Sequence, residues 1–339
     1  MQCMAKKRTR TTPNIEPSEM TITLTTGSPQ APGTSGTHYV DLSLLAGIIN
    51  RRFYRQGLNW AVAGFKFIVG GGIGSVQVSK LPNTWVMKNS WVKGFENWRE
   101  RIDTALGDDD NEVKGKFLDF KVYADDNHRS QALYSLLPLS QSAAAATSGE
   151  WLMSRVNLKI GNGGSVQHEI VAVGDNYPGI VNGYNAVSLI QGYASSRALP
   201  SRVDPNTPDD LDSVAGTAAE NWMTALHNED GSTADQFIIQ NVSGADLPPY
   251  PFENDGTSVD TMYPGGANQL PGLAIHDFAS YSSTSIGGTT YAKGGNFPCG
   301  LIRIDHSVDT ESIAHNLLIQ VDLVPGSHRG YMAEPMGEM

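Results

Sequence analysis

Residues 60–81 read WAVAGFKFIVGGGIGSVQVSKL, two runs of strand-forming residues on either side of three glycines. The first run, residues 60–69, and the second, residues 73–81, are rich in valine, isoleucine and aromatic residues, which suit the pleated surface of a β-sheet. The three glycines, residues 70–72, supply the backbone freedom that a tight connection needs. This segment therefore predicts a β-hairpin.

Alternation of apolar and polar residues predicts further strands on both sides of this segment. Residues 21–25, Thr-Ile-Thr-Leu-Thr, alternate strictly, and a cluster of Gly, Ser and Pro over residues 27–36 then ends the strand. Near the other end of the chain, residues 301–305 and 317–324 are apolar enough to close a sheet. The remaining predicted strands cover residues 116–123, 151–160, 166–173 and 236–240.

Helical spacing predicts three helices in the connections. The strongest covers residues 83–106, where large apolar side chains recur every three or four residues and so share one face. Asn83 or Thr84 can cap its first turn. A shorter helix over residues 41–56 directs leucines and isoleucines inward and ends in three arginines, and a third covers residues 214–226. The apolar face of the long helix consists of Trp91, Phe95, Trp98, Ile102 and Leu106.

Many strands, few helices and long loops together favour an all-β protein built as an antiparallel sandwich, such as a jelly roll. A parallel α/β fold would need a helix between most strands, and the pattern lacks those helices. Gly (36) and Pro (18) are plentiful and charged residues make up only 17% of the chain, which also favours a turn-rich β protein. We expect a flexible basic arm over residues 1–18, one domain over residues 19–325 with long surface loops at about 174–234 and 241–298, and a C-terminal strap or tail over residues 326–339.

Charge is segregated along the chain, whose formal net charge is −11. Residues 1–103 hold thirteen Lys and Arg against six Asp and Glu, whereas residues 203–292 hold thirteen carboxylates and neither Lys nor Arg. A basic surface concentrates phosphates and an acidic one repels them, so this division suits a protein with one face toward a polyanion. Chance clustering of carboxylates in acidic loops is the alternative interpretation.

The sequence holds no familiar catalytic or phosphate-binding motif. Residues 70–74, GGGIG, lack the G-x-G-x-x-G spacing and precede a strand, so a connecting loop explains them better. The chain also lacks a P-loop, a G-x-S-x-G elbow and an H-E-x-x-H pair. We therefore expect no catalytic residue and no cofactor. Asp108, Asp109 and Asp110 could bind a divalent cation at a subunit contact, although a solvated acidic turn explains the same run.

Cysteine usage and hydropathy argue against a disulfide-stabilised protein and a membrane-spanning protein. Cys3 and Cys299 form no disulfide framework and are expected to be free thiols. No apolar run approaches the ~20 residues that a membrane-spanning helix needs, and no secretion signal opens the chain, so we expect no membrane insertion.

Two basic clusters are candidates for nucleic-acid binding. Lys6, Lys7, Arg8 and Arg10 have no carboxylate among them and suit non-specific phosphate contacts, although a solubility tail or an import signal would look the same. Residues 51–55 interleave Arg51, Arg52 and Arg55 with two aromatic residues, which lets guanidinium groups meet phosphates while rings stack on unpaired bases. In the alternative, the two rings, Phe53 and Tyr54, belong to the core and the arginines pair with carboxylates.

Three blocks of sequence are distinctive. Residues 50–57 read NRRFYRQG, residues 79–85 read SKLPNTW and lead into the tryptophan-rich helix, and residues 324–331 read VPGSHRGY. Together they resemble capsid proteins of circular Rep-encoding single-stranded DNA (CRESS DNA) viruses, of the smacovirus-like or a related family. The resemblance covers the first third and the C-terminus of the chain, and the residues between resemble no family that we can place.

The resemblance implies an eight-stranded antiparallel jelly roll of two packed sheets, with one or two helices in the connections. Such proteins self-assemble into small icosahedral shells, usually of about sixty copies, with the arm inside on the genome and the loops outside. The partners would then be other copies of this chain, a circular single-stranded DNA genome and an unidentified host receptor. The protein would reside in the virion and could pass through the host nucleus during assembly.

One departure from the resemblance bears on the genome contact. Many relatives have a long arm dense in arginine, whereas this arm has four cations. The inner wall, Arg51, Arg52 and Arg55 included, or small cations would have to neutralise the remaining genome charge. Residues 83–106 and the edges of the long loops are candidate contacts between copies, and residues 325–339 would either strap onto a neighbour or fray.

Two other classes of protein fit parts of the sequence. A carbohydrate-binding or adhesin-like β-sandwich would also have loops rich in Gly, Asn, Asp and Trp, but it does not need a basic arm. A glycoside hydrolase-like enzyme on a β scaffold would use a pair of carboxylates from the acidic middle of the chain, where no pair stands out by its spacing.

Overall fold

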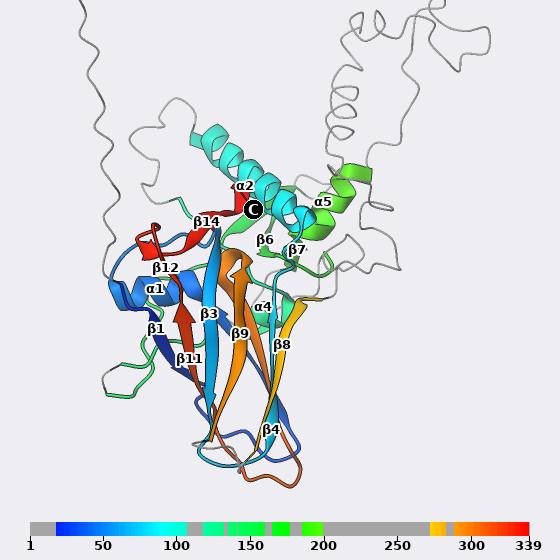
Figure 1. Cartoon of the computed structure of the whole chain (residues 1–339). Coiled ribbons are helices and arrows are strands. Elements are labelled where there is room, and N and C mark those ends of the chain that lie inside the picture. Colours follow the sequence, from blue (N-terminus) through cyan, green and yellow to red (C-terminus); the bar gives the residue numbers. More distant parts are fainter. Residues whose placement is uncertain are drawn as a thin grey trace, which may run out of the picture.

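The computed structural model shows a mostly β protein whose body consists of two antiparallel sheets around one core (Figure 1), as expected for a β-sandwich. Eight strands build this body. They are β1 (Thr21–Thr25), β2 (Ser35–Asp41), β3 (Leu58–Ile68), β4 (Gly74–Lys80), β8 (Ala274–Tyr281), β9 (Thr289–Phe297), β10 (Leu301–Val308) and β11 (Leu318–Leu323). The structure describes residues 18–106, 118–131, 135–140, 142–159, 165–176, 185–198, 272–282 and 288–338.

Strand order is fixed by the pairing registers. In the first sheet, β11 lies between β1 and β3, and β9 pairs with the other edge of β3. In the second sheet, the order is β2-β10-β4-β8. All of these pairs are antiparallel, so the predicted antiparallel all-β body is confirmed.

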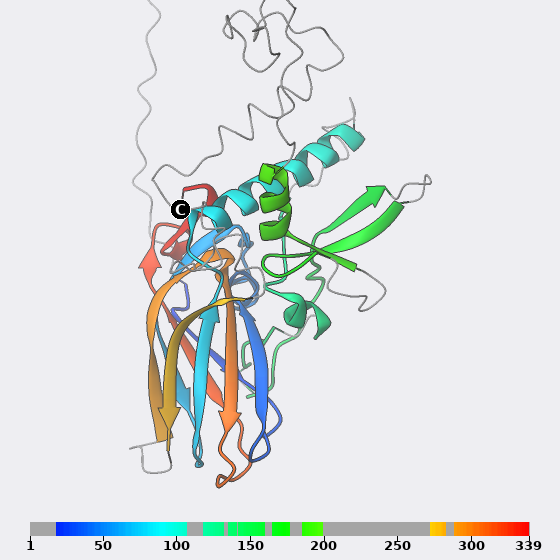
Figure 2. The ribbon, with the colours of Figure 1, turned by 90° about the vertical axis from the view of Figure 1, so that its right-hand side faces the viewer.

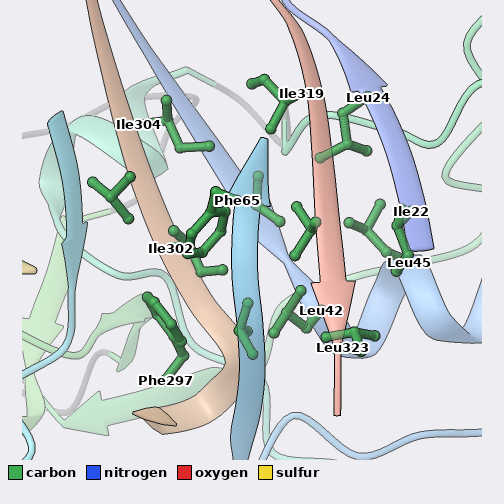
Figure 3. Packing of buried hydrophobic residues seen from close by; sticks show 14 of the residues in the cluster. Ile22, Leu24, Leu42, Leu45, Phe65, Phe297, Ile302, Ile304, Ile319 and Leu323 are labelled. Carbon is green, nitrogen blue, oxygen red and sulfur yellow. The ribbon is translucent and has the colours of Figure 1, made fainter. Parts of the chain in front are cut away.

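The core lies between the two sheets and follows from alternation along the strands. In β11, for example, every second residue is buried, and the buried positions of β1 and β10 follow the same period. Ile22 therefore lies beside Leu45 of the first helix, while Phe65 faces Ile302 of the opposite sheet (Figure 3). Ile302 and Ile304 of β10 line the core from the second sheet, and Phe297 lies in it at the end of β9 in the first sheet.

The predicted hairpin over residues 60–81 is wrong. β3 and β4 follow each other in the chain but belong to different sheets, since β3 pairs with β11 and β9 whereas β4 pairs with β10 and β8. Gly71 (φ 143°) and Gly72 (φ 118°) adopt backbone angles that favour glycine, and here they carry the chain from one sheet to the other.

Helix α1 (Leu42–Asn50) ends earlier than the predicted 41–56 helix. Asp41 caps its start, because the carboxylate accepts hydrogen bonds from the backbone N–H groups of Ser43 (2.9 Å) and Leu44 (3.2 Å). Arg51 ends it by adopting the left-handed conformation. The residues from Arg51 to β3 form a connection of turns and bends, so the three arginines do not share a helical face.

A second unit is inserted between β4 and β8 and projects beside one end of the sandwich (Figure 2). It contains a three-stranded sheet in which β5 and β6 are antiparallel and β6 and β7 are parallel. The predicted strands 151–160 and 166–173 are confirmed as β5 and β6, although they lie outside the sandwich. The elements of this unit are α2 (Trp85–Leu106), α4 (Asp126–Ser130), β5 (Arg155–Lys159), β6 (Ser165–Val171), β7 (Asn185–Ser188) and α5 (Leu189–Ala198).

Helix α2 confirms the predicted 83–106 helix, and it packs within the chain. Thr84, one of the two proposed caps, accepts a hydrogen bond from the backbone N–H of Met87 at 3.4 Å. Trp91 is 8% exposed, and Phe95 and Trp98 pack partly buried against the same cluster. This second cluster joins the inserted unit to the outer side of the sandwich through Tyr39, Cys299 and Leu301.

Two predicted irregular regions contain regular structure. The interpretation of residues 241–298 as loop is wrong for β8 and β9, and that of residues 174–234 is wrong for β7 and α5. Conversely, residues 118–122 of the predicted 116–123 strand pair with no strand, because Gln56 Oε1 accepts from the N–H of Val122 (2.6 Å) and Gln56 Nε2 donates to its carbonyl (3.1 Å). The predicted helix 214–226 and strand 236–240 lie outside the described residues.

The C-terminal segment packs onto its own chain over residues 325–338, and the expected strap onto a neighbouring copy stays a prediction. β14 pairs with the first residues of β3, and Met336 is fully buried. No helix among the described residues is both long and apolar enough to cross a lipid bilayer. The elements of this segment are β12 (Pro325–Gly326), β13 (Gly330–Tyr331), β14 (Ala333–Pro335) and a 3-10 helix, η6 (Met336–Glu338).

Candidate nucleic-acid interface

The aromatic residues of the 51–55 segment divide between the core and a cavity. Tyr54 is 1% exposed and its ring lies 5.8 Å from that of Trp60 and 5.6 Å from that of Tyr331. Phe53 is half-buried and lines a cavity beside α2. The expectation that both rings could stack on bases is therefore wrong for Tyr54, which is a core residue.

The three arginines of this segment point away from the core. Arg51 and Arg55 are exposed, and neither forms a salt bridge with a carboxylate of the described residues. Arg52 is half-buried, and its Nη1 donates to Ser18 Oγ at 3.2 Å. The positive charge of Arg55 nevertheless acts on the carboxyl of Asp119 and lowers its pKa, against the larger effect of burial, so the alternative keeps partial support for Arg55.

Arg329 joins this group from the other end of the chain. Its guanidinium donates to the carbonyl of Phe53, and its own carbonyl accepts from Ser18 Oγ (2.9 Å) and from the hydroxyl of Tyr54 (3.2 Å). Sequence reasoning missed this residue as a binding candidate, because only folding brings the 324–331 block against the 50–57 block. We call Arg51, Arg52, Arg55 and Arg329 the arginine corner.

The basic arm begins at the arginine corner. Lys6, Lys7, Arg8 and Arg10 lie outside the described residues, so their predicted role in binding stays a prediction. Ser18, the first described residue, is bonded to both Arg52 and Arg329. The segment that carries the four cations is therefore attached to the folded body at this corner.

A cavity of about 600 Å³ opens beside the arginine corner. Helix α2 supplies one wall and the end of the C-terminal segment supplies another, and most of the lining is apolar. The polar residues at its edge are two members of the arginine corner and one histidine. The lining includes Phe53, Arg55, Trp91, Val92, Phe95, Asp119, Phe120 and Arg329.

Asp119 is the acidic group of this cavity. Its side chain is 4% exposed, and burial raises the pKa of the carboxyl to about 6, opposed by the nearby charge of Lys121. The backbone N–H of Gln56 donates to its Oδ1 at 3.2 Å. Because the Gln56 side chain also donates to Asp41 Oδ2 (3.0 Å), the cavity is tied to the cap of α1.

A second polar cluster lies at the far end of the sandwich, where β8 ends and β4 begins. His315 Nδ1 lies 2.8 Å from the carbonyl of Ile313 and so carries a proton, which leaves its Nε2 to accept from the hydroxyl of Tyr281 at 2.7 Å. The Tyr281 oxygen then accepts from His306 Nε2–H, also at 2.7 Å. His306 Nδ1 is buried without a hydrogen-bond partner among the described residues.

Burial favours the uncharged form of His306. His306 is fully buried, and burial together with the neighbouring His315 and His38 lowers its pKa to about 4. The described residues contain no group of three or more His, Cys, Asp or Glu placed to hold a metal ion. The weak cation candidate, Asp108, Asp109 and Asp110, lies outside the described residues.

Comparison with known proteins adds no relative. No protein-family model, no curated protein and no solved structure matches this chain.

Proposed function

We propose that this chain is a viral capsid protein, a jelly roll that self-assembles into a shell and packages single-stranded DNA. The order of strand pairing carries the proposal. Counted along the chain, the first sandwich strand pairs with the eighth, the second with the seventh, the third with the sixth and the fourth with the fifth. A long antiparallel ribbon rolled into two sheets has this pairing, and viral capsid domains are among the proteins built this way.

The arginine corner favours a capsid over other jelly rolls. Lectins and cupins share the architecture, so the fold alone does not choose among them. A carbohydrate-binding module has no use for four arginines at the attachment point of a basic arm. Cations placed around one end of the sandwich instead suit the phosphates of a packaged nucleic acid, whose binding needs no sequence-specific contacts.

The β8 and β9 strands offer a surface for self-association. Ile275 and Phe278 on β8 and Tyr291 on β9 are 67%, 60% and 69% exposed. Side chains of β8 already contact the backbone of β9 at Lys293, whose N–H donates to Asp277 (2.8 Å) and whose carbonyl lies 3.0 Å from His276 Nε2. A neighbour would therefore bind through these apolar side chains more than through added strand pairing. We call Ile275, Phe278 and Tyr291 the edge patch.

Placing a charge in the edge patch is expected to prevent assembly. Phe278→Asp should shift the protein from particle-sized species to monomers or small oligomers, because an ionised carboxylate cannot be buried in an apolar contact without a partner. Size-exclusion chromatography with electron microscopy measures this shift. Leu152→Asp is the matched control, since Leu152 is similarly exposed (66%) but lies in the inserted unit. A wild-type protein that stays monomeric at every concentration would contradict the shell itself.

Removal of the arm cations is expected to reduce the packaged nucleic acid. Replacing Lys6, Lys7, Arg8 and Arg10 with Ala should lower the ratio of absorbance at 260 nm to that at 280 nm in purified particles and flatten the salt dependence of DNA binding. Unchanged packaging would mean that Arg51, Arg52 and Arg55 bind the nucleic acid instead of the arm. The same measurement on Ala variants of these three arginines tests that outcome. Particles that hold no DNA in any variant or in the wild type would contradict the packaging function.

A further inference from the structure

We propose that the cavity at the arginine corner binds one base of single-stranded DNA, with the sugar and phosphate held at its rim. The inference rests on the proposed function and adds a defined ligand class to it. The volume of about 600 Å³ lies within the roughly 300–1,000 Å³ range of small-molecule sites, and the lining is mostly apolar. A site with these properties suits a flat, weakly polar group such as a nucleobase.

Aromatic side chains form the inner part of this cavity. Trp91 and Phe95 are stacked, with ring centroids 5.2 Å apart and planes 15° apart, and Phe120 meets Trp91 edge-on at 5.9 Å. Phe53 adds a fourth ring from the arginine-rich segment. Trp91 and Phe120 are buried and form the floor, so the half-buried rings of Phe53 and Phe95 are the surfaces on which an unpaired base would stack, and any base can do so because each has a π-face.

Charge sets the direction in which a nucleotide would enter. The interior is mostly apolar and its acid, Asp119, already pairs with Lys121 (3.8 Å), so burying a phosphate there would cost the phosphate its hydration. Arg55 and Arg329 are exposed residues of the lining, and a phosphate at the rim would be attracted by both. The base therefore points inward and the backbone stays outside.

The attachment of the arm supports the same ligand. Ser18 donates to the carbonyl of Arg329, so the segment with four cations joins the body next to the rim of the cavity. A strand neutralised by those cations would have its bases close to this cavity, at a high local concentration. An apolar peptide would also fit the apolar walls of this cavity. Such a peptide has no negative charge with which the arginines could interact.

An abasic strand separates base binding from phosphate binding. We expect full-length protein to bind a short labelled single-stranded oligonucleotide about tenfold more tightly than an abasic strand of equal length, measured by fluorescence anisotropy. Val92→Trp fills the cavity from α2, where Val92 is half-buried, and should abolish this difference while leaving the affinity for the abasic strand unchanged. Phe53→Ala, on another wall, is the second variant and should reduce the same ratio.

The possible outcomes separate this inference from the proposed function. Equal wild-type affinity for the two strands would overturn the base site and leave DNA packaging intact, whereas binding of neither strand would overturn both. Val92→Trp protein that is folded by circular dichroism and retains the tenfold ratio would place the base elsewhere. Replacing Lys6, Lys7, Arg8 and Arg10 with Ala is the control, since it should weaken both strands equally and preserve the ratio.

Discussion

Acidification from pH 6.5 to about 4 is expected to remove about 2 kcal/mol of unfolding free energy through His306 alone. Its pKa is about 4 in the folded protein and near 6.5 in the unfolded chain, so the unfolded state binds the proton first as the pH falls. The stabilising contribution is therefore complete above pH 6.5 and is lost as the pH falls toward 4. Relaxation of the neighbouring Tyr281 and His315 keeps the loss below the value that the full shift would give.

His306→Gln tests this expectation, because the amide can still donate to Tyr281 but does not titrate in this range. Urea unfolding between pH 7 and pH 4.5 should show a shallower pH dependence for the variant than for the wild type. His276→Gln is the control, since His276 lies at the half-exposed edge formed by β8. Identical slopes for the wild type and the His306 variant would assign the acid sensitivity to other groups. Among these, His128 is fully buried and burial lowers its pKa to about 3.

Gly294→Ala is expected to cost about 3 kcal/mol of unfolding free energy, which is the upper part of the range for overpacking. A Cβ atom at Gly294 would lie 2.2 Å from the carbonyl oxygens of both Val62 and Ala63 in β3. Neither backbone group can move without displacing the pairing of β9 with β3. Thermal or urea unfolding of the purified protein measures the loss.

Gly295→Ala provides a matched comparison one residue away. A Cβ at Gly295 would meet only the ring of His276, at 2.7 Å, and that side chain can rotate. The expected cost is about 1 kcal/mol, from the lost contact between His276 Nε2 and the carbonyl of Lys293. Equal losses of unfolding free energy for the two variants would show that the close approach of β9 to β3 at Gly294 does not require a glycine.

Alternation identified those strands whose inward positions are filled by large apolar residues. β1 and β11 bury Ile, Leu or Val at every second position, β10 does so at Ile302 and Ile304, and the sequence predicts all three strands. β9 has only Ala292 and Phe297 buried, and its Lys-Gly-Gly-Asn run has the composition of a turn. Glycine is needed there for close backbone approach, a tertiary requirement that a local pattern does not reveal.

Some residues of the candidate site are predicted by a local sequence pattern, and others join the site only through tertiary packing. Arg51, Arg52 and Arg55 are found from a local run of cations and rings, and their exposed or half-buried positions agree with it. Arg329 and Asp119 belong to the same place only because the C-terminal segment and residues 118–122 both pack beside Gln56 and Phe53. The spacing of Trp91, Phe95 and Trp98 also predicts the aromatic face of α2. The sequence does not predict that this face forms the wall of a cavity, because that depends on which segment packs against it.

The inserted unit enters and leaves the sandwich at adjacent points, since Lys80 at the end of β4 is paired with Ala274 at the start of β8. For the sandwich, the whole insertion is thus a loop whose ends are already neighbours. The entropic cost of such a loop grows only with the logarithm of its length, by about 0.6 kcal/mol for each doubling. Insertions and deletions between these two residues can therefore accumulate over evolution at little thermodynamic cost to the sheets, provided that the contacts of Tyr39 and Leu301 are preserved.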